Sequence, residues 1–217
     1  MDKTISKVEV KGLEALFYDT LMDIITFGKY RSLIYKALSY IELKDNMKII
    51  DFGCGTGRNI LILNKYAKQK GLNLEFYGID KGKIMLKKAR KKSNKYPNII
   101  IKEGDIREGL NINKKFDAGL ISFVLHGFIQ KDREEILNNF SRYIKKGGKL
   151  YILDYNEINL DKSSLFVKFF YKKVECPLAE DFIKRDLIKM LESYNFKFDR
   201  KILFFKDIIR LAIFSRV

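Results

Sequence analysis

The chain has little of the chemistry that metal-binding and secreted proteins use. It contains one histidine, two cysteines, two prolines and no tryptophan in 217 residues. A single histidine excludes a histidine-based zinc site, and two cysteines are too few for a disulfide framework or a metal cluster. Cysteines this sparse indicate a reducing compartment. We therefore expect no metal in the function of this protein.

Long apolar runs are also missing. No stretch approaches the roughly 18–20 consecutive apolar residues that a membrane-spanning helix needs. Residues 1–11 mix charged and apolar side chains and do not resemble the apolar core of a secretory signal. These features predict a cytoplasmic protein.

Basic residues outnumber acidic residues, 43 to 27, and give a formal net charge of +16. This charge is compatible with nucleic acid, an anionic membrane or acidic substrates, and it does not choose among them. Residues 81–95 carry eight basic side chains and no acid. We favour a solvated helix face there over a patch for phosphate or anionic lipid. The length and a hydrophobic content of 47% are sufficient for one domain with a full core.

The chain is organised around a short apolar run that ends at Asp51. Three glycines follow at alternate positions, Gly53, Gly55 and Gly57, and an amphipathic run predicts a helix over residues 59–67. A strand, a tight glycine turn and a helix begin a nucleotide-binding unit. Gly53 and Gly57 permit positive φ, and Gly55 lets the backbone lie against a ligand.

This pattern, Asp51-x-Gly53-x-Gly55-x-Gly57, resembles motif I of the Rossmann-like S-adenosylmethionine (SAM) methyltransferases. It differs from the G-x-G-x-x-G of NAD enzymes, and no P-loop Lys-Ser/Thr follows. The resemblance implies an α/β fold with a seven-stranded, mostly parallel sheet, an antiparallel last strand and helices on both faces. It also implies that SAM is the cofactor, that S-adenosylhomocysteine (SAH) is the product, and that the cofactor contacts Asp51, Gly53, Cys54, Gly55, Thr56 and Gly57.

The second predicted strand, Leu74–Ile79, is followed by Asp80. The distance from the glycine loop is close to that of an acid which hydrogen-bonds ribose hydroxyls, although a plain helix cap is the alternative. The residues after Asp80 and the fourth predicted strand, Phe116–Phe123, also resemble methyltransferase motifs. The resemblance implies that an acid and its neighbour contact adenine and that the end of the fourth strand faces the methionine part of SAM. It thus assigns further cofactor contacts to Asp80, Lys81, Met85, Asp105, Ile106, Ser122 and Phe123.

His126 is the candidate catalytic base. It lies just past the fourth strand, at the carboxyl edge where ligands bind in open α/β sheets. An ordinary imidazole pKa near 6.5 suits proton transfer at neutral pH. Oxygen and aromatic carbon acceptors need such a base, whereas a neutral amine need not. A packing or capping role for His126 is the alternative.

Residues 1–45 predict a helical cap in front of a SAM-binding domain over residues 46–217. Apolar residues recur there at helical spacing, and Gly28 separates two expected helices. The segment that contains Tyr18, Tyr30 and Arg31 partly resembles the opening of the UbiE-type quinone C-methyltransferases, with Tyr30 in place of the usual histidine. The resemblance implies that these three residues contact the substrate. An ordinary amphipathic helix pair is the alternative.

The remaining elements follow from apolar patterning and turn residues. Residues 165–173 form an apolar-aromatic run ringed by lysines, which is compatible with an interfacial helix, a lid over an apolar substrate or a helix packed on the sheet. The other expected elements are a strand over Asn98–Ile101, a helix over Glu134–Tyr143, a strand over Leu150–Tyr155, a helix over Asp181–Tyr194, and strands over Phe196–Phe205 and Ile208–Phe214.

These features together predict a SAM-dependent methyltransferase for a small or lipid-like acceptor such as a quinone precursor. The alternatives are N-methylation of a phospholipid headgroup, RNA methylation, and SAM binding without catalysis. RNA is disfavoured because the chain has neither an appended RNA-binding module nor the [Asn/Asp]-Pro-Pro-[Tyr/Phe] tetrad after the fourth strand. Peripheral contact with an anionic membrane stays open.

Overall fold

The computed structural model describes residues 29–158 and 177–217. Strands and helices alternate through most of this part, as a doubly wound α/β fold requires. The strands are β1 (Lys48–Phe52), β2 (Glu75–Asp80), β3 (Ile99–Glu103), β4 (Phe116–Ser122), β5 (Ile144–Tyr155), β6 (Phe196–Phe204) and β7 (Ile209–Arg216). The helices are α2 (Lys29–Leu38), α3 (Arg58–Gln69), α4 (Lys83–Ser93), the short 3-10 helix η1 (Leu125–Gly127), α5 (Gln130–Tyr143), α7 (Pro177–Phe182) and α8 (Leu187–Glu192).

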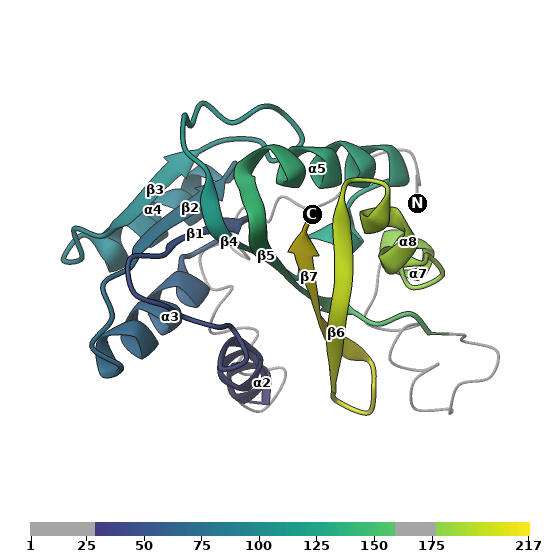
Figure 1. Cartoon of the computed structure of the whole chain (residues 1–217), viewed down its shortest axis with the longest axis horizontal. Helices are drawn as coiled ribbons and strands as arrows, with labels where there is room; N and C mark the ends of the chain where they lie inside the picture. Colours follow the sequence, from purple (N-terminus) through teal and green to yellow (C-terminus); the bar gives the residue numbers. More distant parts are fainter. Residues whose placement is uncertain (1–28, 159–176) are drawn as a thin grey trace.

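All seven strands form one sheet in the order β3-β2-β1-β4-β5-β7-β6 (Figure 1). Neighbouring strands from β3 to β5 are parallel, whereas β7 is antiparallel to both β5 and β6. The chain order reverses at β1 and β4, so their carboxyl ends border a crevice of the kind in which such sheets bind ligands. The predicted sheet and its antiparallel closing strand are confirmed.

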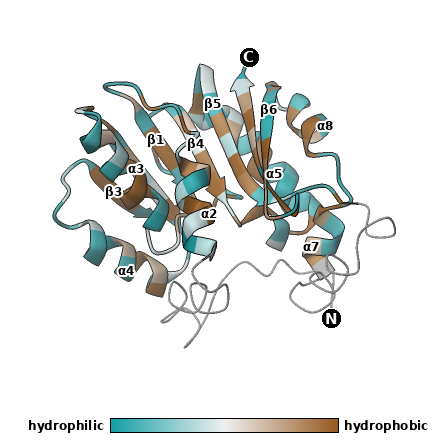
Figure 2. Cartoon of the chain, turned by 90° about the horizontal axis from the view of Figure 1, so that it is seen from below, coloured by the Kyte–Doolittle hydropathy of each residue, from teal (hydrophilic) through white to brown (hydrophobic). Residues whose placement is uncertain are grey.

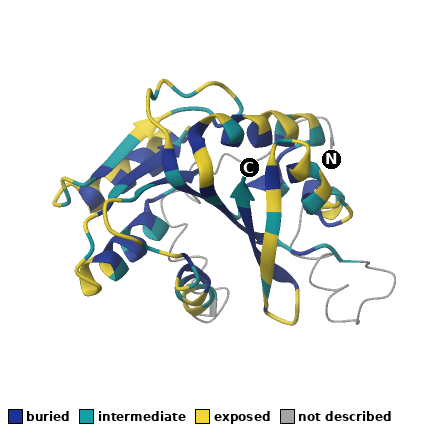
Figure 3. Ribbon diagram, in the orientation of Figure 1, coloured by how far each residue is buried: buried dark blue, intermediate teal, exposed yellow. Residues whose placement is uncertain are grey.

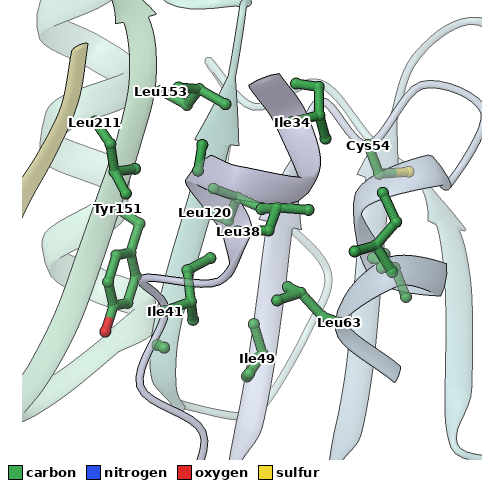
Figure 4. Close-up of a cluster of buried hydrophobic side chains, with 14 of the residues drawn as sticks. Ile34, Leu38, Ile41, Ile49, Cys54, Leu63, Leu120, Tyr151, Leu153 and Leu211 are labelled. Atoms are coloured by element: carbon green, nitrogen blue, oxygen red, sulfur yellow. The ribbon is translucent and has the colours of Figure 1, made fainter. Parts of the chain in front are cut away.

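Each face of the sheet has its own core, because successive side chains of a strand point to opposite faces. On β5, Tyr151 and Leu153 belong to the cluster beneath α2 and α3, while Leu150 and Ile152 belong to the cluster beneath α5 and α8. Figure 4 shows α2 packing its apolar residues, among them Leu38, onto the first of these faces. The central strands are buried and the outer surfaces of the helices are exposed (Figure 3).

The observed bounds differ most from the predicted ones at two elements. The single helix expected over Asp181–Tyr194 is wrong, because α7 ends at Phe182 and α8 begins at Leu187. Asp186 separates the two helices: its backbone is extended, and its carboxylate accepts a hydrogen bond from the Lys189 N–H at 3.1 Å as the cap of α8. Strand β5 begins at Ile144, six residues earlier than expected, and pairs with β4 across an irregularity in register.

The expected N-terminal cap is described only from residue 29 onward. Helix α2 contacts α3, and its residues Ile34, Ala37 and Leu38 are buried against the sheet. Tyr18 and residues 165–173 lie outside the described residues. Within the described ranges, no helix combines the length and the apolar character needed to cross a membrane.

Candidate active site

The glycine-rich loop between β1 and α3 lies at the carboxyl edge of the sheet. Its three glycines have φ values of +77°, +52° and +76° at Gly53, Gly55 and Gly57, a region that side chains rarely adopt. The loop is fixed to β2, because the N–H groups of Gly53 and Cys54 both donate to the carbonyl of Ile79, at 2.8 and 2.9 Å. The turn expected from the sequence is therefore present and rigidly held.

Two of these glycines differ in what surrounds them. A Cβ at Gly53 would lie 2.8 Å from Cγ2 of Val124, so this position packs against the segment after β4. A Cβ at Gly55 would meet no atom of the described part of the chain within 4 Å. Gly55 thus borders open space, and a ligand can approach its backbone closely there.

Asp51 is an uncompensated acid next to this loop. Its side chain is buried, and neither carboxylate oxygen has a hydrogen-bond partner among residues 29–158 and 177–217. Burial, and secondly the charge of Asp80, raise the pKa of Asp51 to about 8, while the side chain of Asn59 opposes the shift. A buried carboxylate without a partner is stabilised by a nearby cation. SAM carries two cationic groups, its sulfonium and its α-ammonium, so this orphaned acid fits the predicted cofactor.

Asp80 ends β2 and faces the glycine loop. One carboxylate oxygen accepts from the Gly55 N–H at 2.7 Å, and the other accepts from the Gly82 N–H at 2.8 Å. These contacts fix the carboxylate beside the open space at Gly55. A carboxylate has about four acceptor positions, so each oxygen retains capacity for a ribose hydroxyl.

Asp105 follows β3 and is the centre of an ion-pair cluster. Its carboxylate pairs with the guanidinium of Arg107 at 2.5 Å and with the ammonium of Lys81 at 3.0 Å. The hydrogen bonds from Arg107, more than the opposing burial, hold the pKa of Asp105 far below its usual range. Lys81 is therefore joined by an ion pair to Asp105, the acid that was predicted to contact adenine. The neighbouring Ile106 is buried in the core beneath α5.

The carboxyl end of β4 places His126 beside a buried acid. Nδ1 of His126 lies 2.8 Å from Oδ1 of Asp154, whose side chain is 1% exposed. This contact fixes the orientation of the imidazole through Nδ1, and a carboxylate in this position can stabilise a positive charge on the ring. The imidazole is 20% exposed and thus remains accessible. A base held by a third group in this way can take a proton from a substrate.

One aromatic ring lies against this histidine, and two more continue from that ring. The ring of Tyr155 lies 4.9 Å from the imidazole, and Phe123 contacts both Tyr155 at 6.1 Å and Tyr30 of α2 at 5.7 Å, between centroids. Phe123 has φ of +54°, a left-handed conformation that costs roughly 1–3 kcal/mol and that often occurs at functional sites. We call Tyr30, Phe123, His126 and Tyr155 the aromatic cluster.

The other predicted site residues have varied surroundings. Cys54 points its sulfur into the core beneath α2 and α3, so only its backbone borders the loop. Thr56 and Met85 are buried, and Ser122 is half-buried at the end of β4. Arg31 is exposed and its guanidinium lies over the ring of Tyr35.

Two residues of the site were not singled out from the sequence. Asp154 lies near the carboxyl end of β5, where an acid in an apolar strand is a usable signal. Arg133 is a fully buried residue of α5. Its guanidinium donates to the carbonyls of Leu125 and Leu178 at 3.1 and 2.9 Å and pairs with Asp181 at 2.6 Å. Arg133 therefore ties the His126 segment to α7, which only the folded chain reveals.

The fold and the site together define the class. The antiparallel hairpin β6–β7 closes a doubly wound sheet, and a glycine loop, a buried acid and Asp80 meet at its carboxyl edge. By fold and by family, this chain is a methyltransferase domain of the Rossmann-like type. The chain belongs to the methyltransferase domain family, whose model matches residues 43–199.

Individual relatives are more distant. The chain is 33% identical over 116 residues to protein 235L of Invertebrate iridescent virus 6, across 54% of this chain and 40% of that protein. It is 29% identical over 161 residues to the ubiquinone/menaquinone biosynthesis C-methyltransferase UbiE of Campylobacter jejuni, across 72% of this chain and 66% of that protein. A SAM-dependent methyltransferase structure from Aquifex aeolicus superposes with a TM-score of 0.63 at 19% identity, across 85% of this chain and 89% of that one.

Proposed function

We propose that this protein transfers the methyl group of SAM to a small aromatic or lipid-like acceptor of the quinone-precursor class. The observation that carries the proposal is the His126–Asp154 pair set among the rings of the aromatic cluster. A planar aromatic acceptor can stack against such rings. The Campylobacter jejuni relative, by its name a quinone C-methyltransferase, supports the same acceptor class.

The residues of the loop supply the proposed cofactor contacts. Asp51 would balance the positive charge of SAM, Gly55 would let its backbone approach the ligand, and Asp80 would accept from the ribose hydroxyls. Asp105 and Ile106 would border the adenine, with Lys81 and Arg107 holding the Asp105 carboxylate in place. When bound, SAM supplies an electrophilic methyl group on a sulfonium, which needs only a well-placed nucleophile.

The proposed role of His126 is to remove the proton that a hydroxyl or aromatic carbon acceptor must lose. The proton would move from the acceptor to the imidazole, and the buried carboxylate of Asp154 would stabilise the imidazolium that results. Asp154 also accepts from the Tyr155 N–H at 2.8 Å, so it is held in position by its own strand end. Asp154 acts through His126 and is therefore a positioning residue.

The acceptor class can be tested with labelled cofactor. Purified protein and methyl-labelled SAM are incubated with an extract of cells that lack this gene, and the products are divided into an organic phase, RNA and water-soluble metabolites. The proposal predicts label in the organic phase, removable by the substitution His126→Gln. Label in RNA or only in water-soluble products would contradict it. Chromatography of the organic products against phospholipid and quinone standards separates the headgroup alternative from the quinone class.

A further inference from the structure

The ends of β2 and β3 bring an acid and basic residues together at the carboxyl edge of the sheet. These two strands are parallel neighbours, and Asp80 at the end of β2 is in register with Glu103 at the end of β3. Helix α4 lies next to β3, at the end of the molecule opposite β6 (Figure 2). The aligned strand ends place Lys81, which follows β2, beside Asp105, which lies two residues past β3.

The carboxylate of Asp105 accepts four hydrogen bonds. Its Oδ1 accepts from the backbone N–H of Arg107 at 3.1 Å and from Nε of Arg107 at 3.0 Å. Its Oδ2 accepts from Nη2 of Arg107 at 2.5 Å and from the ammonium of Lys81 at 3.0 Å. An ionised carboxylate has about four acceptor positions, two on each oxygen. Donors of this chain therefore occupy every acceptor position of Asp105.

The guanidinium of Arg107 is held by more than Asp105. Its Nη1 donates to the carboxylate of Asp132 in α5 at 3.2 Å, and its central carbon lies 6.0 Å from the centroid of the Phe128 ring. Arg107 thus bridges two carboxylates and lies over an aromatic face. A rotation away from Asp105 would also break the contact with Asp132, so the guanidinium has a fixed position.

The backbone that carries this ion pair is fixed as well. The buried side-chain amide of Asn139 in α5 donates to three consecutive carbonyls, those of residues 106–108, at 3.0, 2.9 and 2.9 Å. On the other side, the N–H of Gly104 donates to the carbonyl of Asp80 at 3.0 Å. The loop after β3 is therefore anchored to both α5 and β2. This preformed arrangement requires little ordering when a ligand binds beside it.

An adenine amino group could reach the Asp105 carboxylate only by displacing one of these donors. The amino group is neutral, whereas Arg107 and Lys81 are cations whose hydrogen bonds to a carboxylate are also ion pairs and are therefore stronger. The hydrogen bonds from Arg107 also hold the pKa of Asp105 below its ordinary range. The carboxyl group is thus ionised at neutral pH and cannot donate to a ring nitrogen of the base. The exchange is unfavourable.

We infer that Arg107 and Lys81 set the base selectivity of the cofactor site, because they occupy the carboxylate that would otherwise accept from the 6-amino group of adenine. This inference rests on the proposed cofactor contacts at the loop after β3. The site then binds SAH and an analogue without that amino group about equally well, through contacts that do not involve the amino group. Arg107 and Lys81 act through Asp105 and are therefore positioning residues.

The test compares two ligands, SAH and its purine analogue, in which hydrogen replaces the 6-amino group. Both are titrated by calorimetry into the full-length wild-type protein and into Lys81→Met, which removes a side chain that is 59% exposed. The control is Lys83→Met, the same change at an exposed lysine of α4. We expect wild type and control to prefer SAH by less than about threefold. Lys81→Met opens one acceptor position, and one hydrogen bond to a carboxylate should raise the preference to about tenfold.

The ratio of the two affinities separates this effect from a structural one, because a loosened loop weakens both ligands alike. If wild type prefers SAH by about tenfold or more, or if Lys81→Met leaves the ratio unchanged, the inference is wrong. The proposed cofactor site would survive either result, since SAH still binds. If SAH does not bind to wild type, the proposed cofactor contacts and this inference are both wrong. Circular dichroism verifies that both variants are folded.

Discussion

The substitution Asp51→Asn should raise the stability of the folded protein and weaken its binding of a cationic ligand. The pKa of Asp51 is raised from its ordinary value of 3.8 to about 8, chiefly by burial. A raised pKa means that the folded state holds a proton which the unfolded chain releases above about pH 4. At about pH 7 the difference of roughly three units costs the fold about 4 kcal/mol, at 1.36 kcal/mol per unit.

Asparagine carries no charge and removes this cost. We expect the apo variant to be more stable than wild type by up to about 4 kcal/mol at pH near 7, with a further rise up to pH near 8 and no gain below pH near 4. The buried amide offsets part of the gain, because an unpaired polar group costs about 1–3 kcal/mol. Urea unfolding at several pH values measures the difference.

Asp117→Asn is a control for which we expect the opposite change in stability. The Asp117 carboxylate accepts from the ammonium of Lys145 at 2.6 Å and from the Lys48 N–H at 2.8 Å, and these partners lower its pKa despite partial burial. A carboxyl group whose pKa is lowered by folding stabilises the protein at pH values above its pKa in the unfolded chain. This stabilisation is lost as the pH falls. Asp117→Asn should therefore destabilise the protein at neutral pH, with an effect that fades in acid.

The same Asp51→Asn substitution should weaken SAM binding, because the variant cannot balance the positive charge of the ligand. Wild type should also release a proton when SAM binds at neutral pH, and the variant should not. Calorimetry in two buffers of different ionisation enthalpy counts that proton. A variant that is no more stable than wild type at about pH 8, or that binds SAM with unchanged affinity, would refute the assignment of Asp51 as an uncompensated acid at the cofactor site.

Three further predictions concern the loop, the base and the buried arginine. Asp80→Ala should weaken SAM binding by roughly 1.5–3 kcal/mol, measured by calorimetry, and unchanged affinity would exclude the ribose contact. His126→Gln should lower kcat by about 10²–10⁴-fold with SAM affinity preserved. Asp154→Asn should also lower kcat and alter its pH profile. An unchanged kcat in both variants would refute the role of His126 as the catalytic base. Arg133→Leu should reduce the free energy of unfolding by about 2–4 kcal/mol, since two buried carbonyls and Asp181 lose a donor, and a neutral effect would contradict that role.

Local patterns were sufficient to locate the strands, and the resemblance to the SAM methyltransferases implied how they are arranged in one sheet. The β-branched and apolar runs of β1, β4 and β5 identify central strands, and the glycines after Asp51 identify the turn with its positive φ values. The break between α7 and α8 was missed because their apolar periodicity continues across it. The Asp186 cap ends the pattern there, together with a hydrogen bond at 3.0 Å from the Leu187 N–H to the carboxylate of Glu157, which is distant in the sequence.

The sequence predicted individual residues of the site, but it did not predict the contacts between them. His126 stood out as the only histidine, but its pairing with Asp154 joins η1 to the end of β5, 28 residues further along the chain. The four-residue aromatic cluster depends on α2 packing beside β4, which no periodicity encodes. The pairing of Asp105 with Lys81 and Arg107 similarly depends on how the ends of β2 and β3 meet.

A crystal structure with bound SAH would test the central claim most directly. The account predicts ribose hydroxyls within hydrogen-bond distance of the Asp80 carboxylate, the ligand backbone against Gly55, and the sulfur directed toward the aromatic cluster and His126. SAH bound elsewhere, or bound at the loop with its sulfur directed away from His126, would contradict the proposed site and the role of the histidine.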